Sequence, residues 1–344
     1  MIDIRSDTVT QPTPAMRSII TNAKVGDDVY DDDSTIKLLE KMSAEIVGKQ
    51  AALFVPSGTF GNQLALFTWC PRGTEVILGE ECHIVQHEAG APSIIAGVQL
   101  RQIPEENGKL KAEEIKKRIR KRDLHAPATS LICLENAHSY GKAIPLKDMD
   151  KVFSLAKKYK LPVHLDGARI FNAAEALNTT AKEIADRASS VMFCLSKGLC
   201  APVGSLLAGD REFIAEARMK RKIMGGGMRK VGFLGACGVM ALTEMTKRVV
   251  EDNGNARMLE EGLSKIRGIT VRKECDVNMV FFKCDNLNLR LKKASEITEE
   301  FRKNDIIINS CDKDGLFRFV THYWIKEKDI EAIVYVANKI FGGL

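Results

Sequence analysis

Two stretches of the sequence, Val163-His164-Leu165-Asp166-Gly167-Ala168-Arg169 and Val191-Met192-Phe193-Cys194-Leu195-Ser196-Lys197-Gly198, share one pattern. In each, a short apolar run leads to a charged side chain and a glycine, which is typical of a buried strand that ends in a turn. The 31-residue step from Asp166 to Lys197 leaves room for a helical crossover between the two strands. The pair predicts an α/β fold with both charged groups at the edge of a sheet where ligands bind.

The same alternation extends outward from this pair. Amphipathic helical patterns occupy residues 34–48, 111–122 and 146–160, and further strand patterns occupy residues 51–55, 75–78, 98–103, 130–134 and 205–207. Strands that alternate with helices favour parallel pairing with right-handed crossovers. We therefore expect a large domain built on a mainly parallel sheet of the seven-stranded type.

The character of the chain changes after Val231. An apolar helical stretch runs to about Ile266, with a break or bend expected at Asn253-Gly254. Strand patterns at residues 277–283, 306–309 and 316–320 then alternate with helical patterns at residues 290–303 and 328–340. We expect two domains: residues 1–250, including an N-terminal arm over residues 1–30, and a small α+β domain over residues 251–344.

Composition excludes several classes of protein. The 344 residues are 45% hydrophobic and 28% charged, and no stretch approaches the roughly 20 apolar residues of a membrane span. The net charge of +6 is too small to indicate nucleic-acid binding. Nine scattered cysteines without a Cys-x-x-Cys pair indicate reduced thiols, not a disulfide or zinc framework. We expect a cytoplasmic protein that acts on small molecules, without a nucleic-acid or membrane partner.

Three of the predicted strand ends carry groups that suit a phosphorylated aromatic cofactor. Gly58 and Thr59 open a helix whose free N–H groups could bind a phosphate, although such a turn is often only a cap. Asp166 could pair with a protonated ring nitrogen, or it could cap the following helix. Lys197 is costly to bury unless it is paired or covalently modified, and burial favours its neutral, imine-forming amine. A structural lysine could also reach solvent from this strand end.

A fourth group, His83, follows the strand pattern at residues 75–78. An imidazole there could stack on a flat ring or move a proton, although a lone histidine is more often incidental. Together the four features supply a phosphate cradle, a ring-nitrogen partner, an imine-forming lysine and a ring-side histidine. This set is the one that pyridoxal phosphate requires. The sequence therefore predicts a pyridoxal-phosphate enzyme.

At these residues the sequence resembles the low-specificity L-threonine aldolases, a branch of the aspartate-aminotransferase-like superfamily. The resemblance covers essentially the whole chain and implies an aminotransferase-like fold with the cleavage of L-threonine or L-allo-threonine to glycine and an aldehyde. The matching stretches are Arg5-Ser6-Asp7-Thr8-Val9-Thr10, Gly26-Asp27-Asp28-Val29-Tyr30, Pro56-Ser57-Gly58-Thr59 with Gly61-Asn62, residues 164–172, residues 196–205, Gly225-Gly226-Gly227-Met228-Arg229 and Val320-Thr321-His322.

The resemblance implies a role for each matching cofactor residue. Lys197 would hold pyridoxal 5'-phosphate and Asp166 would pair with its pyridine nitrogen. Gly58 and Thr59 would bind the phosphate. His83 would stack on the ring and is our expected base, acting directly or through water.

The resemblance also implies how substrate and subunits are bound. Ser6, Arg169 and Arg318 match positions that hold the substrate carboxylate or the phenolic edge of the cofactor, and an arginine can grip a carboxylate through two hydrogen bonds. His125 matches a second histidine near the substrate hydroxyl. The family is usually a homotetramer in which a basic segment, here with Arg229 and less securely Lys222, reaches the cofactor site of a neighbouring subunit.

Some features leave alternatives open. The stretch Glu135-Asn136-Ala137-His138-Ser139-Tyr140-Gly141-Lys142 departs from the pattern of the family and could alter substrate entry. Glu88 could hold a water beside His83, or be a surface carboxylate. No metal site is expected, because the triplet Asp31-Asp32-Asp33 fits a helix cap. The runner-up reactions are β-elimination and transamination on the same scaffold. A nicotinamide oxidoreductase would need a Gly-x-Gly-x-x-Gly turn after an early strand, and a non-catalytic binding protein would be expected to lack Lys197 or Asp166.

Overall fold

The computed structural model describes residues 1–272, 274–284 and 294–342. These residues form two compact units, one of Gln11–Thr246 and one of Met1–Thr10 with Lys247–Leu344. The first ten residues of the N-terminal arm thus group with the C-terminal part of the chain. The expected domains, residues 1–250 and residues 251–344, stay a prediction. None of the described helices has both the length and the apolar character needed to cross a membrane.

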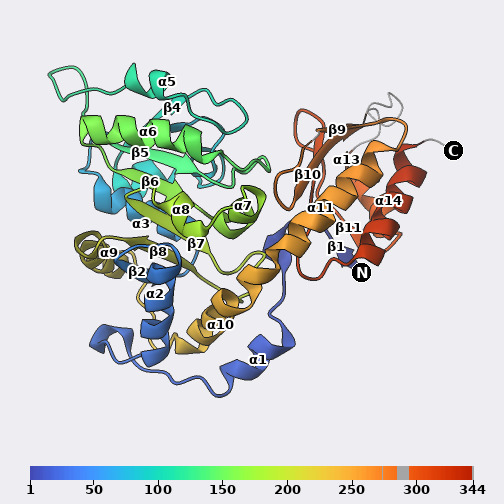
Figure 1. Ribbon diagram of the computed structural model, residues 1–344, viewed down its shortest axis with the longest axis horizontal. Helices are drawn as coiled ribbons and strands as arrows, with labels where there is room; N and C mark the ends of the chain where they lie inside the picture. The colour runs from blue at the N-terminus through green and yellow to red at the C-terminus, as the bar shows by residue number, and fades with distance from the viewer. Residues whose placement is uncertain (273, 285–293, 343–344) are drawn as a thin grey trace. The chain divides into compact units, whose positions relative to one another are not determined.

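The larger unit is built on one seven-stranded sheet (Figure 1). Its strands follow the order β2-β8-β7-β6-β5-β3-β4, and all pairs are parallel except those that β8 makes with β2 and β7. The predicted α/β class and mainly parallel sheet are therefore confirmed. The strands are β2 Ala51–Val55, β3 Glu75–Gly79, β4 Gln99–Ile103, β5 Thr129–Glu135, β6 Val163–Asp166, β7 Ser190–Cys194 and β8 Ser205–Gly209.

Helices follow most of these strands, as the alternating pattern predicted. Asp33 caps the helix at 34–46 through its side chain, which accepts from the N–H of Ile36, as expected for the Asp31-Asp32-Asp33 triplet. The helices of this unit are α1 Pro14–Ile20, α2 Ser34–Ile46, α3 Gly58–Trp69, α4 His83–Gln86, α5 Ala112–Lys116, α6 Leu146–Tyr159, α7 Ile170–Ala176, α8 Ala181–Ala185, α9 Arg211–Ile223 and α10 Gly232–Thr243.

The helix expected over residues 111–122 is shorter than predicted, because the chain turns early toward the sheet. Arg120 exchanges two hydrogen bonds of 3.0 Å with Thr129 at the start of β5, one through its N–H and one through its carbonyl. Its guanidinium also pairs with the buried carboxylate of Glu75 on β3. These contacts take residues beyond Lys116 away from a helical path.

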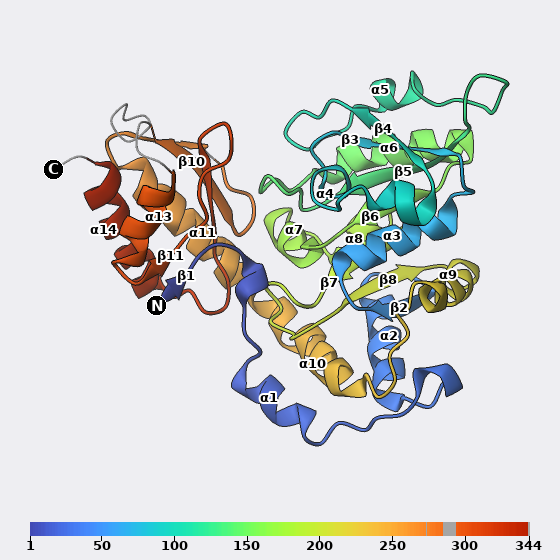
Figure 2. The ribbon, with the colours of Figure 1, turned by 180° about the vertical axis from the view of Figure 1, so that it is seen from behind.

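The helix α3 lies across one face of the sheet (Figure 2), and two glycines let it approach closely. A Cβ added at Gly61 would lie 2.6 Å from Cγ of Met192 on β7, and one at Gly58 would lie 2.9 Å from Sγ of Cys194. Both distances are shorter than a normal carbon or sulfur contact. The absence of side chains at these two positions therefore sets the separation between α3 and β7.

On the edge strand β2, side chains bind the outward-facing backbone groups of Phe54. The N–H of Phe54 donates to Oε1 of Glu40 at 2.9 Å, and its carbonyl accepts from Nη1 of Arg221 at 2.8 Å. Arg221 also pairs with Asp28, and Arg218 bonds Glu40 at 2.7 Å. Unpaired backbone groups on an edge strand invite pairing with other chains. The bonds to Glu40 and Arg221 satisfy the N–H and the carbonyl of Phe54.

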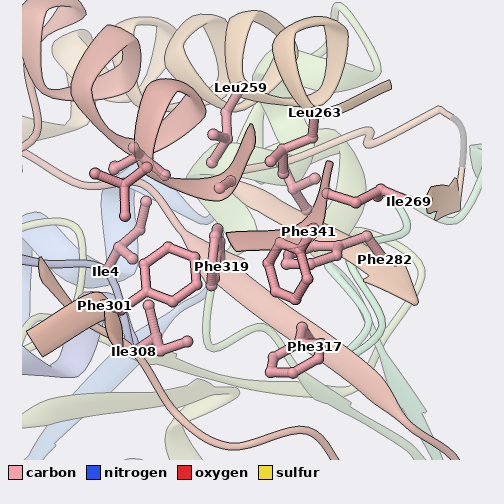
Figure 3. Packing of buried hydrophobic residues seen from close by; sticks show 14 of the residues in the cluster. Ile4, Leu259, Leu263, Ile269, Phe282, Phe301, Ile308, Phe317, Phe319 and Phe341 are labelled. Atoms are coloured by element: carbon pink, nitrogen blue, oxygen red, sulfur yellow. The ribbon is translucent and has the colours of Figure 1, made fainter. Parts of the chain in front are cut away.

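The smaller unit combines a three-stranded antiparallel sheet with helices. The strand order is β12-β10-β9, and β1 pairs in parallel with β11 (Figure 1). Its core is rich in phenylalanine: the Phe282 ring stacks on Phe317 with 5.3 Å between centroids, and Ile4 of the N-terminal segment is buried among the same residues (Figure 3). The elements are β1 Ile2–Asp3, α11 Val249–Ser264, β9 Ile269–Arg272, β10 Met279–Cys284, α13 Ala294–Arg302, β11 Ile306–Ile307, β12 Leu316–Val320 and α14 Glu327–Phe341.

Of the break or bend expected at Asn253-Gly254, the break is wrong. The helix α11 runs uninterrupted through both residues, and the break lies instead between Thr243 and Val249, where a short 3-10 turn separates α10 from α11. A single glycine costs a helix only about 1 kcal/mol, and the fully buried Asn253 shows that packing on this helix outweighs that cost. Residues 290–293 of the helix expected over residues 290–303 lie outside the described residues.

Replacing Gly61 by alanine tests the close packing of α3. We expect Gly61→Ala to lower the free energy of unfolding by about 1–3 kcal/mol, because its Cβ would overlap Met192 in a packed core. Gly254→Ala is the matched control, since nothing lies within 4 Å of a Cβ there. That variant should gain up to about 1 kcal/mol from helix propensity alone. Urea denaturation measures both; equal stabilities for the two variants would contradict the packing account.

Candidate active site

Asp166 ends β6 and is 3% exposed, and its carboxylate accepts two hydrogen bonds. One comes from the N–H of Ala168 at 3.0 Å and the other from Nδ2 of Asn62, on α3, at 2.7 Å. The N-cap of the following helix α7 is Arg169, so Asp166 does not cap that helix. The two donors fix the orientation of the Asp166 carboxylate at the end of the strand, which suits a partner for a protonated ring nitrogen.

His83 begins α4 and is hydrogen-bonded to Glu88. The Nδ1–Oε1 distance is 2.9 Å, and Glu88, which is buried, also accepts from Nδ2 of Asn62 at 2.8 Å and from Nε2 of Gln63. Burial lowers the pKa of His83, but the hydrogen bond to Glu88 and the charge of Asp166 outweigh it, so the pKa is raised overall. Glu88 is thus a buried partner of His83 and not a surface carboxylate.

The same three side chains satisfy the spacing of a metal site. Donor atoms of His83, Glu88 and Asp166 lie within 4.8 Å of one another in the described part of the chain. Asn62 donates to both carboxylates. The hydrogen bonds from Asn62 explain why the two carboxylates lie close together, and we assign no metal to the three side chains.

Lys197 follows β7 within a tight turn beside this cluster. The turn is held by the N–H of Cys200, which donates to the Lys197 carbonyl at 2.9 Å, and by the N–H of Ala201, which donates to Leu195 at 3.0 Å. The side chain is half-buried, and its charge opposes protonation of His83. Lys197 therefore lies within electrostatic reach of His83 at the carboxyl edge of the sheet.

The first turn of α3 fits a phosphate. Ser57 caps the helix by accepting from the N–H of Phe60 at 3.1 Å, which leaves the N–H groups of Gly58 and Thr59 without an acceptor inside the helix. Gly58 has no room for a Cβ because of Cys194. The turn is thus both a helix cap and an anion cradle, and with Asp166 and Lys197 it supplies the groups that pyridoxal phosphate needs.

The loop that departs from the family pattern is tied to His83 through Glu135. Oε2 of Glu135 accepts from the N–H of His83 at 2.7 Å, while Oε1 accepts from the N–H and hydroxyl of Ser139 at 2.6 and 2.5 Å. Tyr140 donates its hydroxyl proton to Glu81 at 2.6 Å. The serine at position 139 therefore binds the residue that holds the backbone of His83.

The remaining predicted site residues lie on other segments of the chain, and two of them belong to the other unit. Arg169, at the start of α7, is half-buried, and Arg229 is exposed and pairs with Asp27 at 3.1 Å. His125 lies in an exposed turn whose N–H donates to Asp123. Lys222 is exposed at the end of α9. In the smaller unit, Ser6 caps a short 3-10 turn and Arg318 lies in β12 opposite Phe281.

Asn62, His164 and Ser190 join these groups, and none of them was assigned a role from the sequence, although Asn62 and His164 lie in the stretches that match the family. Nε2 of His164 lies 3.1 Å from Oδ1 of Asn62, and its Nδ1 lies 2.9 Å from Oγ of Ser190. Ser190 also accepts from the indole N–H of Trp69 at 2.9 Å. Two signals could have found part of this set: His164 and Asp166 are two residues apart and so share one face of a strand, and Asn62 is one helical turn beyond Gly58.

The fold and the site together define a pyridoxal-phosphate-dependent α/β enzyme. A family model described as beta-eliminating lyase matches residues 3–286, and the chain belongs to this family. It is 42% identical to the probable low-specificity L-threonine aldolase 2 of Arabidopsis thaliana, over 99% of this chain and 97% of the relative. It is 38% identical to the low specificity L-threonine aldolase of Escherichia coli (strain K12), over 97% of each chain.

Solved structures support the same fold. The threonine aldolase of Leishmania major aligns with a TM-score of 0.84 at 21% identity, over 99% of this chain and 100% of that one. The resemblance inferred from the motifs is therefore confirmed at the level of the family and of the fold.

The protonation of His164 predicts a pH dependence of stability. Burial lowers the pKa of His164 from 6.5 to about 4, so the folded protein keeps the ring neutral while the unfolded chain takes up a proton below 6.5. Stability should therefore be lost as the pH falls from 6.5 toward 4, by up to about 3 kcal/mol from this residue. Denaturation at several pH values would measure it, and His164→Gln should show a flatter profile. Parallel profiles for the two proteins would contradict this assignment.

Proposed function

We propose that this protein cleaves L-threonine or L-allo-threonine to glycine and acetaldehyde, with pyridoxal 5'-phosphate as cofactor. The observation that carries the proposal is the linked set of Asp166, Asn62, Glu88 and His83 beside Lys197. The curated names of the relatives at 38% and 42% identity support the same reaction.

The residues present fit the cofactor at each of its functional groups. Lys197 would attach it covalently, Asp166 would bind the ring nitrogen, and the N–H groups of Gly58 and Thr59 would bind its phosphate. When bound, the cofactor supplies an electron sink that accepts the electron pair of the breaking Cα–Cβ bond. Asp166 favours this chemistry because its negative charge keeps the ring nitrogen protonated.

The reaction also needs a group that accepts the proton of the substrate β-hydroxyl. As this O–H bond breaks, Cβ becomes the aldehyde carbon, and Cα later takes up a proton to give glycine. His83 is our candidate for the first proton, because it lies half-buried next to Asp166 and Lys197. Its Nδ1 is bound to Glu88, so Nε2 is the nitrogen available to the substrate or to a bridging water.

We assign the substrate carboxylate to Arg169, Ser6 and Arg318, and the substrate hydroxyl to His125 as a second contact. Arg169 follows the Asp166-Gly167-Ala168 turn, so it is held at the same edge of the sheet as Asp166. A guanidinium binds a carboxylate through two parallel hydrogen bonds, which would orient Cα relative to the ring. Substitution of Arg318 by lysine should raise KM more than it lowers kcat if this assignment is right.

Removal of Lys197 tests the cofactor chemistry. The purified protein, loaded with pyridoxal 5'-phosphate, should release acetaldehyde from L-threonine or L-allo-threonine, and Lys197→Ala should abolish the release because the amine is lost. An aldehyde assay with each substrate separately also reports the preference at Cβ. Release of ammonia and a keto acid in place of aldehyde and glycine would favour β-elimination or transamination. A yellow protein that produces neither would keep the cofactor and exclude the assigned reaction.

Substitution of His83 tests the proton acceptor. We expect His83→Asn to lower kcat by about 10²–10⁴-fold, the usual contribution of a positioned general base. Stopped-time aldehyde assays from pH 6 to 9 would measure the loss, with cofactor absorbance as a check that the site is still loaded. An unchanged kcat would remove His83 from this role and leave a water or another side chain as the base.

We propose that the protein is a cytoplasmic homotetramer with shared active sites. Its nine cysteines are all free, as expected for a reducing compartment. Two segments carry exposed apolar side chains: Val29 and Tyr30 on one, and Met219 and Ile223 on the other. Asp28, next to Val29, joins the two segments through its ion pairs with Arg218 and Arg221. Exposed apolar side chains are typical of interfaces, and the adjacent Arg229 could reach a neighbouring site.

Sedimentation tests the assembly. The native protein should sediment as a tetramer, and a double variant, Met219→Glu with Ile223→Glu, should sediment as a smaller species because two charges would have to be buried at the interface. A native monomer would overturn the assembly, and cell fractionation would test the compartment.

A further inference from the structure

A buried chain of hydrogen bonds ends on the two carboxylates of the site. It runs from Nε1 of Trp69 to Oγ of Ser190 at 2.9 Å, then to Nδ1 of His164 at 2.9 Å, and from Nε2 of His164 to Oδ1 of Asn62 at 3.1 Å. Nδ2 of Asn62 then reaches Asp166 at 2.7 Å and Glu88 at 2.8 Å. Asn62, His164 and Ser190 are fully buried.

The chemistry of the two ends fixes every donor in between. Ionised carboxylates only accept hydrogen bonds, so the amide N–H₂ of Asn62 must face Asp166 and Glu88 and its oxygen must face His164. Nε2 of His164 therefore carries the proton, and Nδ1 must accept from the hydroxyl of Ser190. At the other end, an indole N–H only donates, and Ser190 accepts from it. The indole end is compatible with this arrangement, and the neutral ring follows from burial, which lowers the pKa of His164 to about 4.

The same arrangement answers an electrostatic problem. Two carboxylates buried within reach of one another repel, and commonly one of them takes up a proton. Here one amide group donates to both, and the donor chain behind it prevents the amide from turning. Asp166 would face the ring nitrogen of the cofactor, and Glu88 accepts from Nδ1 of His83.

We propose that Asn62 is a positioning residue that holds the carboxylates of Asp166 and Glu88 side by side, so that one side chain sets both the ring-nitrogen partner and the hydrogen-bond partner of His83. The part that concerns cofactor affinity rests on the proposed function, whereas the part that concerns His83 applies to the protein without cofactor. The charged or titratable groups that face His83 are Glu88, Asp166 and Lys197, with the His87 ring at 5.4 Å and Glu135 on its backbone N–H.

Two neighbouring amides on α3 allow a matched comparison. Asn62 and Gln63 are both buried and both donate to Glu88, but only Asn62 also donates to Asp166. Asn62→Ala should weaken binding of pyridoxal 5'-phosphate about tenfold or more, the loss expected when a charged acceptor loses its donor. Gln63→Ala should weaken it less than about threefold, because Asp166 keeps its bonds.

The second readout needs no cofactor. NMR titration of the cofactor-free protein would follow its six histidines, with His83→Asn used to assign the His83 signal. In Asn62→Ala the two carboxylates lose their shared donor, so Glu88 is no longer held against Nδ1 of His83, and the pKa of His83 should fall below its value in the native protein. Gln63→Ala should move it less. A residue that only stabilised the fold would change the melting temperature without moving this pKa.

A third variant leaves the whole carboxylate cluster in place. Ser190→Ala removes the donor to His164 and frees the ring to change tautomer, so cofactor affinity should fall in the same direction as in Asn62→Ala but by less. This variant keeps the proposal testable if Asn62→Ala does not fold. Unchanged cofactor affinity in Ser190→Ala, or equal effects of Asn62→Ala and Gln63→Ala on both readouts, would overturn it.

The outcomes separate this inference from the proposed reaction. A native protein that binds pyridoxal 5'-phosphate but cleaves no threonine would end the proposed function, while the differences among the variants in cofactor affinity and in the pKa of His83 would still support Asn62. A native protein that cleaves threonine, with no such differences among the variants, would support the proposed function and overturn the role of Asn62.

Discussion

One side-chain amide between two buried carboxylates is the contact on which the site depends. Asn62 can bond Asp166 only because α3 lies close to the sheet, and α3 lies close because Gly58 and Gly61 leave no side chain against Cys194 and Met192. A parallel sheet brings strand ends to one edge, where the last residues of β5 and β6, Glu135 and Asp166, lie opposite each other. The close packing of α3 and the parallel strands therefore determine where the charged side chains of the site lie.

This edge of the sheet concentrates negative charge in a dry environment. Burial raises the pKa of Glu135, and the charge of Asp166 adds to that effect, although the nearby His138 opposes it. Each carboxylate of the edge is bound by donors: Asp166 by Ala168 and Asn62, Glu135 by His83 and Ser139. Such an edge favours a ligand with positive charge, such as a protonated cofactor ring. The same carboxylates raise the pKa of His83.

The sequence was sufficient for the parts of the fold that depend on local pattern. The seven strands of the large sheet, the cap at Asp33 and the strand ends at Asp166 and Lys197 follow from apolar runs and turn residues. Elements held by distant partners were not visible. The strand β1 has two residues and exists because it pairs with β11, and α5 ends early because Arg120 binds Glu75 and Thr129.

The same distinction applies to the site. Asp166, Lys197, Gly58 and His83 could be proposed because each follows a strand pattern. The partners Asn62 and Ser190 are small polar residues whose positions in the sequence give no sign of the side chains they bind. Their importance appears only when residues more than 100 positions apart, such as Asn62 and Asp166, are brought together. Charge patterns in one sequence cannot report such pairs.

The capped edge of β2 bears on how the chain matures during synthesis. Glu40 precedes β2 and emerges from the ribosome before it, whereas Arg221 comes from α9, after the last strand of the large sheet. Until α9 is made, the carbonyl of Phe54 has no side-chain partner from that helix, and the strand could recruit a foreign one. A nascent chain halted between β8 and α9 would therefore have β2 paired on one side while the outward carbonyl of Phe54 still lacks Arg221, and a chaperone would protect that edge.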